Sequence, residues 1–306
     1  MHQEKNAELL YTAAYLISRL PMRVLYILSD GLYVIMYHMV RYRRGIVKKN
    51  LQSSFPEKTD SERKDIEKRF YHWFCDYFFE TLKLLTATED EVRSLIDLHD
   101  FDKITDVLEE GRSVAVMLGH YCNWEMLSCA QIFRNDEPHA VLGLIYHPLY
   151  NKSADRLFLR LREKHGGTCV AKQNILRNLV TLKKEGTPSY FGYILDQSPK
   201  WQNIHLWLDF MNQDTPVFTG AERIARKMQN VVVYADMSRP KRGHYSCTFT
   251  VITDKPQEME EYELTRKTFR LLEQTIRRQP EYYLWTHNRW KRQRKDAPEN
   301  IKTETH

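Results

Sequence analysis

The residues best suited to chemistry lie in the segment Gly119-His120-Tyr121-Cys122-Asn123-Trp124-Glu125. Its histidine and its carboxylate are five positions apart, and an apolar run, residues 114–118, comes directly before them. A strand over that run would end at His120, and a turn leading into a helix would bring Glu125 back towards the imidazole. This spacing predicts a general base with its orienting carboxylate. The alternative is an ordinary loop histidine followed by a glutamate that is favoured near the start of a helix.

A second polar pair follows another predicted strand. Asp196 and Gln197 come directly after the apolar segment 189–195, so they too emerge at a strand end. Polar groups at strand ends are common in the sites of α/β sheets, although Asp and Gln before Ser and Pro also suit a plain turn. Arg239, between two predicted strands, is a candidate for contacting an acidic headgroup or carrier protein, with a solvated hairpin turn as the alternative.

The elements that must position these residues alternate along the chain from residue 113 onwards. Apolar runs predict strands at 113–118, 140–145, 189–195, 204–209, 231–236 and 245–252. Periodic segments predict helices at 123–134, 150–164, 173–185, 217–229 and 260–278. The alternation predicts an α/β fold, with a mixed sheet flanked by helices and polar groups gathered at strand ends.

The region before residue 113 is expected to be helical. Residues 59–85 show a long helical pattern with a cap at Thr59 or Asp60, and residues 100–110 form a second pattern that Gly111 ends. Residues 50–56 are expected to form a loop, because Pro56 cannot continue a helix.

The N-terminal segment predicts a membrane anchor. Residues 8–40 are rich in apolar side chains, but polar residues interrupt every stretch before it reaches the length of a simple spanning helix. Two helices that meet at Pro21 fit better, the second running to about residue 40. We expect residues 1–45 to be a monotopic or shallowly inserted anchor, and residues 46–306 to be one α/β domain that includes a helical region at 46–110. A buried core helix is the alternative.

Charge and cysteine usage narrow the class of protein further. The chain has 306 residues and a net charge of +6, with basic clusters at 41–49 and 289–295 that suit anionic partners or a solvated surface. The basic residues are not interleaved with a nucleic-acid-binding module, so no nucleic-acid partner is expected. The five cysteines form no disulfide framework, and no zinc-ligand spacing occurs, so we expect a reducing compartment, no metal and no cofactor.

Several landmarks in order give a resemblance to a known family. They are the Gly119-His120-x-x-Asn123-Trp124-Glu125 motif, the N-terminal helices, Arg41-Tyr42-Arg43-Arg44, Phe55-Pro56-Glu57, Asp196-Gln197 and the terminal Trp285-x-His287-x-Arg289-Trp290-Lys291. With them the chain resembles the bacterial lipid A biosynthesis (late) acyltransferases, which belong to the wider lysophospholipid and glycerol-phosphate acyltransferase group. The similarity spans nearly the whole chain.

The resemblance implies an acyltransferase that moves a fatty acyl chain from a thioester, such as acyl-acyl carrier protein, to a hydroxyl of a lipid A precursor. It implies that His120 is the general base and Glu125 its orienter, and that Asp196 and Gln197 lie near the acceptor. Asn123 or backbone N–H groups would stabilise the oxyanion. It also implies lipopolysaccharide (glycolipid) biosynthesis at the cytoplasmic face of a bacterial cell inner membrane.

One departure from the family pattern concerns the acceptor. Family members often carry Tyr-Arg-Pro where this chain has Tyr146-His147-Pro148, and histidine lacks the permanent bidentate grip of arginine on phosphate. Lys152, Arg156 or Arg160 would then supply the cation. A lysophospholipid, an aminolipid or another glycolipid is therefore an alternative acceptor, and a non-catalytic membrane-binding protein is an alternative of another class. Cys122 as an acylated nucleophile is a rival mechanism.

Overall fold

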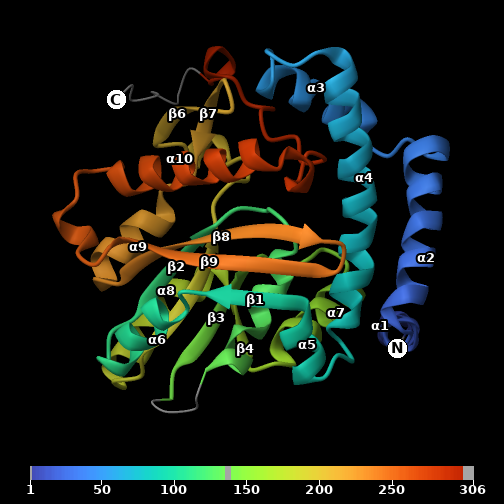
Figure 1. Ribbon diagram of the computed structural model, residues 1–306. Helices are drawn as coiled ribbons and strands as arrows, with labels where there is room; N and C mark the ends of the chain where they lie inside the picture. Colours follow the sequence, from blue (N-terminus) through green and yellow to red (C-terminus); the bar gives the residue numbers. More distant parts are fainter. Residues whose placement is uncertain (1, 135–138, 299–306) are drawn as a thin grey trace.

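A seven-stranded sheet forms the centre of the molecule, with the strand order β1-β9-β8-β2-β5-β3-β4 (Figure 1). The computed structural model describes residues 2–134 and 139–298, and only the backbone of residues 2–7. The strands are β1 (Ile96–His99), β2 (Val114–Leu118), β3 (Val141–Tyr146), β4 (Gly167–Ala171), β5 (Ser189–Ile194), β8 (Val231–Lys241) and β9 (His244–Thr253). Neighbours run parallel except β8 and β9, which are antiparallel, so the sheet is mixed as predicted.

Helices cover both faces of the sheet (Figure 1). They are α1 (His2–Ser18), α2 (Met22–Tyr33), α3 (Arg44–Ser54), α4 (Asp60–Lys83), α5 (Glu89–Leu95), α6 (Asp102–Glu109), α7 (Lys152–Glu163), α8 (Ile175–Lys184), α9 (Gly220–Met228) and α10 (Glu263–Arg278). The π-helix is η1 (Val34–Met39), and the 3-10 helices are η2 (Trp124–Phe133), η3 (Lys172–Asn174), η4 (Trp201–Asn203), η5 (Pro256–Glu258), η6 (Pro280–Tyr282) and η7 (Arg294–Asp296). In Figure 1, α10 packs above β8 and β9, whereas α6 lies below the sheet.

Burial explains why the sequence indicates the central strands so clearly. All five residues of β2 are buried, because the strand pairs with β5 and β8 on its two sides and is covered above and below. A strand of this kind has a continuous apolar sequence rather than an alternating one. The predicted strands at 113–118, 140–145, 189–195, 231–236 and 245–252 are therefore confirmed.

The long helix α4 begins where its capping residues predict. Thr59 accepts a hydrogen bond from the backbone N–H of Glu62, and the Glu62 carboxylate accepts one from the backbone N–H of Thr59. This capping box satisfies N–H groups that have no partner inside the helix. In Figure 1, α4 stands along one end of the sheet and separates it from α2.

The N-terminal segment breaks at Pro21 as predicted, but its second half is not a uniform α-helix. The chain changes from α2 to the π-helix η1 at Val34. Among the described helices, none alone has the length and apolar character of a membrane span. Residues Glu8–Ser18 and Met22–Met39 reach that length only together, with a bend of 117° between them. Their exposed large apolar side chains are Leu9, Leu10, Tyr15, Leu16, Val24, Ile27, Leu28, Val34, Ile35 and Met39.

Two predictions about local structure are wrong, and two others hold only in part. Residues 50–54 belong to α3 instead of a loop, because the Asn50 amide donates to the carbonyls of Trp285 and His287 and the buried Leu51 packs in the core. The segment 123–134 forms the 3-10 helix η2 instead of an α-helix. The predicted strand 204–209 is β6 (Leu206–Phe210), which pairs only with β7 (Gln213–Val217), outside the main sheet. The helix expected to begin at residue 217 begins at Gly220, after β7.

Three strands were not predicted: β7, which pairs only with β6, and the two edge strands of the main sheet, β1 and β4. β1 and β4 lie at the two ends of the sheet, and their residues alternate between buried and more exposed environments. Edge strands are short and carry polar residues, so their apolar signal is weak.

Candidate active site

The ends of two neighbouring parallel strands meet at the candidate site. β2 and β5 pair in register from Val114 with Tyr190 to Leu118 with Ile194. The backbone N–H of Leu195 then donates to the carbonyl of Leu118, at 3.2 Å. The residues that follow each strand, His120 and Asp196, therefore emerge side by side, as expected at the carboxyl edge of an α/β sheet.

Asp196 holds His120 through two hydrogen bonds. Its Oδ1 lies 2.6 Å from Nδ1 of His120, and its Oδ2 accepts from the backbone N–H of His120 at 3.0 Å. Burial of this carboxyl favours its neutral form, but the charge and hydrogen bonds of His120 outweigh that effect and lower the pKa of Asp196. An ionised Asp196 fixes the imidazole with its proton on Nδ1.

The second ring nitrogen of His120 faces an amide. Nε2 of Gln197 lies 3.1 Å from Nε2 of His120. Because Nδ1 donates to Asp196, Nε2 of the imidazole carries the lone pair and accepts from the Gln197 amide. This tautomer is the one that a general base needs, because a substrate hydroxyl that displaces the Gln197 amide would meet the unprotonated nitrogen.

The expectation that Glu125 orients His120 is not met, because Glu125 binds Arg162 instead. Oε2 of Glu125 lies 2.7 Å from Nε of Arg162, and Oε1 lies 2.6 Å from its Nη2. The chain turns through Cys122 at φ 50° before η2 begins, and the ring of Trp124, rather than a carboxylate, packs edge-on against the imidazole. The pair of Glu125 and Arg162 raises the pKa of Arg162, although burial acts in the opposite direction.

Arg162 is the functional candidate that sequence reasoning missed. It lies in α7 on the same helical face as Asp155, Phe158 and Leu159, and all four side chains line the cleft described below. Their spacing of three, four and seven residues is that of one helix face. That pattern, with an arginine among apolar residues, is the sequence signal that could have identified it.

The C-terminal landmark residues hold the His120 loop in place. The backbone N–H of Leu284 donates to the carbonyl of His120 at 3.1 Å, and that of Cys122 donates to the carbonyl of Tyr282 at 2.9 Å. Nε2 of His287 accepts from the backbone N–H of Ser198, and burial lowers the pKa of His287 to about 4, so this ring is neutral. The segment 280–289 thus supports both strand ends from behind.

Two hollows adjoin this loop. An open cleft with about 1330 Å³ of unfilled space is lined by His120 and Gln197 together with Tyr77, His147 and Lys172. An apolar chamber with about 670 Å³ of unfilled space lies between the sheet, η2 and α6. The two hollows share the lining residues Trp124, Glu125, Ile145, Arg162 and Ile194, so the ion pair of Glu125 and Arg162 stands where the cleft meets the chamber.

The other residues that were predicted to contact substrate do not all lie at the cleft. His147 is exposed and lines the cleft, whereas Lys152 is exposed at the start of α7 and is not among the lining residues. Asn123 is fully buried, and its Oδ1 accepts from the hydroxyl of Thr81 at 3.3 Å, so its side chain is directed towards α4 and away from the cleft. Asn123 therefore does not line the cleft, and its contact with substrate stays a prediction.

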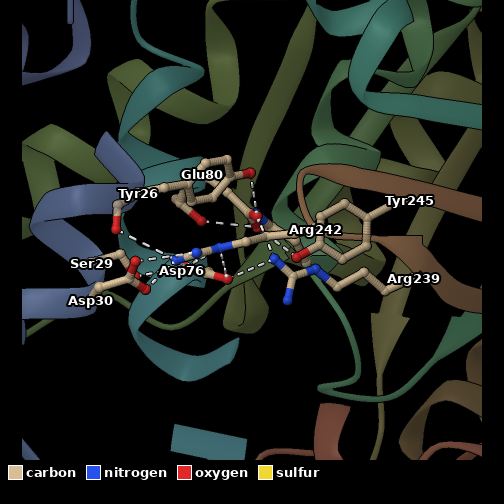
Figure 2. A network of polar contacts seen from close by, with 10 residues as sticks. Tyr26, Ser29, Asp30, Asp76, Glu80, Arg239, Arg242 and Tyr245 are labelled. Carbon is tan, nitrogen blue, oxygen red and sulfur yellow. Dashed lines mark hydrogen bonds and ion pairs between the residues drawn. The ribbon is translucent and has the colours of Figure 1, made fainter. Parts of the chain in front are cut away.

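Arg239 is also misassigned by the sequence, because it belongs to a buried charge network (Figure 2). Its Nη2 lies 2.8 Å from Asp76 and 2.9 Å from Glu80, both on α4. Arg242 binds the same Asp76 and also reaches Asp30 of α2 at 2.6 Å. The network joins α2, α4 and the β8–β9 hairpin, so Arg239 is not available to a headgroup or carrier protein.

The environment of Cys122 argues against covalent catalysis. The side chain is fully buried, and desolvation raises the pKa of its thiol well above the usual value. A nucleophilic cysteine needs a lowered pKa and an accessible sulfur.

We therefore expect Cys122→Ala to retain near-wild-type turnover and to lose only about 1 kcal/mol of unfolding free energy. Steady-state kinetics together with denaturant unfolding would measure both effects. A folded Cys122→Ala protein without turnover would instead support the covalent scheme.

Comparison with known proteins identifies the family of this chain. Residues 5–292 match the model of the bacterial lipid A biosynthesis acyltransferase family. A lipid A biosynthesis palmitoleoyltransferase of Escherichia coli is 22% identical over 89% of this chain and 87% of its own length. A lauroyltransferase of lipid A biosynthesis from the same organism is 22% identical over 93% and 90%, and a lipid A biosynthesis acyltransferase of Haemophilus influenzae is 20% identical over 71% and 66%. The chain belongs to the bacterial lipid A biosynthesis acyltransferase family and is an acyltransferase.

Proposed function

We propose that this acyltransferase moves a fatty acyl chain from the thioester of an acyl carrier protein to a hydroxyl of a lipid A precursor. The observation that carries the proposal is the imidazole of His120, held by Asp196 on Nδ1 with Nε2 facing an open cleft. The adjoining apolar chamber supports a substrate with an alkyl chain.

In the proposed reaction, Nε2 of His120 takes the proton of the acceptor hydroxyl as its oxygen attacks the thioester carbonyl. The tetrahedral intermediate collapses to the ester, the carbon–sulfur bond breaks, and the imidazolium returns the proton to the leaving thiolate. Asp196 stabilises the imidazolium and remains ionised throughout. A positioned base of this kind contributes roughly 10²–10⁴-fold to the rate.

The role of Glu125 in this proposal changes from orienting the base to positioning Arg162. Both carboxylate oxygens bind the guanidinium, whose remaining N–H groups lie at the boundary of cleft and chamber. A charge that is fixed before the reaction, in a site from which water is excluded, stabilises a developing oxyanion strongly. Arg162 and backbone N–H groups of the His120 loop are the candidates for this role.

The cleft suits an acceptor with anionic groups. His147 and Lys172 are exposed along its wall, and Lys152 is exposed one helical turn before the lining residue Asp155. The two lysines support a phosphorylated precursor even though His147 stands where an arginine is common in the family. The same residues would also suit a lysophospholipid, an aminolipid or another glycolipid, which is the second candidate class of acceptor.

The N-terminal segment supports the proposal that the enzyme binds a membrane. In this proposal the enzyme acts at the cytoplasmic face of the inner membrane. Large apolar side chains of α1, α2 and η1 are exposed, and the basic residues 41–49 follow directly. Amphipathic helices of this kind lie within the interface of an anionic bilayer. Residues 1–45 would then be the anchor and residues 46–306 the acyltransferase domain.

Replacing Leu16 and Ile27 with Asp should therefore weaken binding to anionic vesicles by roughly tenfold or more, since each side chain would lose its burial in lipid. Vesicle co-sedimentation measures the effect. The matched control is Val251→Asp, which changes an exposed apolar side chain on β9 and should bind as the wild type does. Equal loss of binding in the control would contradict the assigned face.

The proposed reaction is tested by supplying the purified protein in detergent with acyl carrier protein or coenzyme A thioesters and a panel of acceptors. Free thiol and a heavier acceptor should appear together with the correct pair. Mass spectrometry of lipid A from cells that lack the protein should show one missing acyl chain. Unaltered lipid A together with activity on a lysophospholipid or aminolipid would favour the second acceptor class.

A further inference from the structure

One glycine of the apolar chamber has no structural need to be a glycine. Gly192 lies in β5, which pairs with β2 on one side and β3 on the other. A Cβ built at this position would meet only Cδ2 of Leu118, at 3.8 Å, which is ordinary van der Waals contact. Glycine inside a strand weakens it and often marks a place where a ligand approaches closely.

A second glycine shows what a structurally required one looks like. A Cβ at Gly143, on the neighbouring strand β3, would lie 2.0 Å from the ring of Phe191. Gly143 is thus needed for packing on its face of the sheet. The free space at Gly192 belongs instead to the chamber.

Gly192 lies between two other residues of β5 that line the chamber. Tyr190, Gly192 and Ile194 share one face of β5 because side chains alternate along a strand, and all three line the chamber. Ile194 also lines the cleft, so it marks the mouth next to His120. Tyr190 lies four residues away, about 13 Å along the strand, and its hydroxyl donates to Gln131 at 2.7 Å, which fixes the ring near the far end.

We propose that this chamber holds the acyl chain of the donor and that Gly192, with the end wall at Tyr190 and Ile104, sets the longest chain that the enzyme transfers. The inference rests on the proposed acyl transfer and adds to it the residues that select the donor. The donor carbonyl must lie beside His120 during attack, so its alkyl chain enters the hollow whose mouth adjoins that residue. The chamber is narrow and apolar, which suits one chain rather than the multiple chains of a lipid A precursor.

A larger side chain at Gly192 should therefore lower turnover of long donors and leave turnover of short donors unchanged. Gly192→Leu should leave turnover of a donor of about 8 carbons near that of the wild type and lower turnover of a donor of about 16 carbons by 100-fold or more, at about fourfold per methylene excluded. Gly192→Ala should shift the optimum by only one or two methylenes. Ile104→Ala, which opens the end wall, should shift the optimum towards longer chains.

The experiment measures kcat/KM for a series of acyl thioesters with one fixed acceptor. Stabilisation of each variant by the same thioesters, measured by thermal unfolding, gives a readout that does not need turnover. The matched control is Gly220→Leu at the start of α9, where the added side chain meets open space. It should keep the wild-type length profile.

The possible outcomes separate the inference from the function on which it rests. An unchanged length profile in Gly192→Leu, or an equal loss at all lengths, overturns the role of Gly192. A changed dependence on the chains of the acceptor, with the donor profile intact, overturns the assignment of the chamber to the donor. A wild-type enzyme that binds long thioesters but transfers none of them overturns the proposed function. The role of the chamber is then tested by binding alone, because Gly192→Leu should still bind long thioesters more weakly than short ones.

Discussion

Asp196→Asn is expected to lower kcat for acyl transfer by roughly 10³–10⁴-fold while the protein stays folded. The amide oxygen would keep the hydrogen bond from the backbone N–H of His120. The amide nitrogen would then face Nδ1 and act as a donor, which forces the imidazole proton onto Nε2. An imidazole in that tautomer cannot take the proton of the acceptor hydroxyl.

Single-turnover kinetics on four variants would isolate this effect. His120→Ala should lose at least as much activity as Asp196→Asn, because it removes the base itself. Gln197→Ala should lose less, since Gln197 only contacts Nε2. Asp214→Asn is the matched control, because Asp214 forms an exposed ion pair with Arg294 and should not affect turnover.

Glu125→Gln tests whether Glu125 acts on Arg162, with which it pairs in the structure, or orients His120, as the sequence predicts. If Glu125 acts through Arg162, this variant should lower kcat and leave the acid limb of the pH–rate profile in place. If Glu125 oriented the base, Glu125→Gln would be as damaging as Asp196→Asn is predicted to be. Near-wild-type activity in Asp196→Asn with a large loss in Glu125→Gln would contradict the pairing described above.

Arg239→Met is expected to lower the free energy of unfolding by about 3–5 kcal/mol, the largest effect on stability that the structure predicts. The guanidinium lies between Asp76 and Glu80, and the side chains of all three residues are almost completely buried (Figure 2). Removing the cation would leave two buried carboxylates near each other, with Arg242 as the remaining cation. The loss of unfolding free energy arises more from these uncompensated negative charges than from the lost ion-pair contacts themselves.

Denaturant unfolding in detergent, followed by tryptophan fluorescence, would measure the loss. Arg242→Met is the matched control: it also removes a cation from Asp76, but its side chain is 40% exposed and solvent screens the change, so a smaller loss is expected. Adding Glu80→Gln to Arg239→Met should restore part of the stability, because it removes one of the unpaired charges. No recovery in the double variant would contradict the electrostatic explanation.

The same variants test how the N-terminal helices are held. Asp76 also accepts from the hydroxyl of Ser29 at 2.7 Å, and Glu80 accepts from Tyr26, so the network attaches α2 to α4. Membrane binding by α2 would then fix the orientation of the whole sheet relative to the bilayer. Limited proteolysis between α2 and α3 should become faster in Arg239→Met if this attachment weakens.

Local features of the sequence determined most of the elements and some of their ends. The apolar runs of β2, β5 and β8 identify central strands, because such strands are buried on both faces and need no alternation. The capping residues Thr59 and Glu62 identify the start of α4, since their hydrogen bonds join residues only three positions apart. The sequence also placed His120 and Asp196 at strand ends, which is where catalytic groups of an α/β sheet lie.

Only the tertiary structure decided which of these polar groups meet. Asp196 is 76 residues from His120, and β2 and β5 become neighbours through non-local pairing that no short pattern encodes. Glu125, five residues from His120, follows a left-handed turn at Cys122 and binds Arg162 of α7 instead. The sequence therefore determined that His120 is a candidate base at a strand end, whereas long-range packing decided that its carboxylate partner is Asp196.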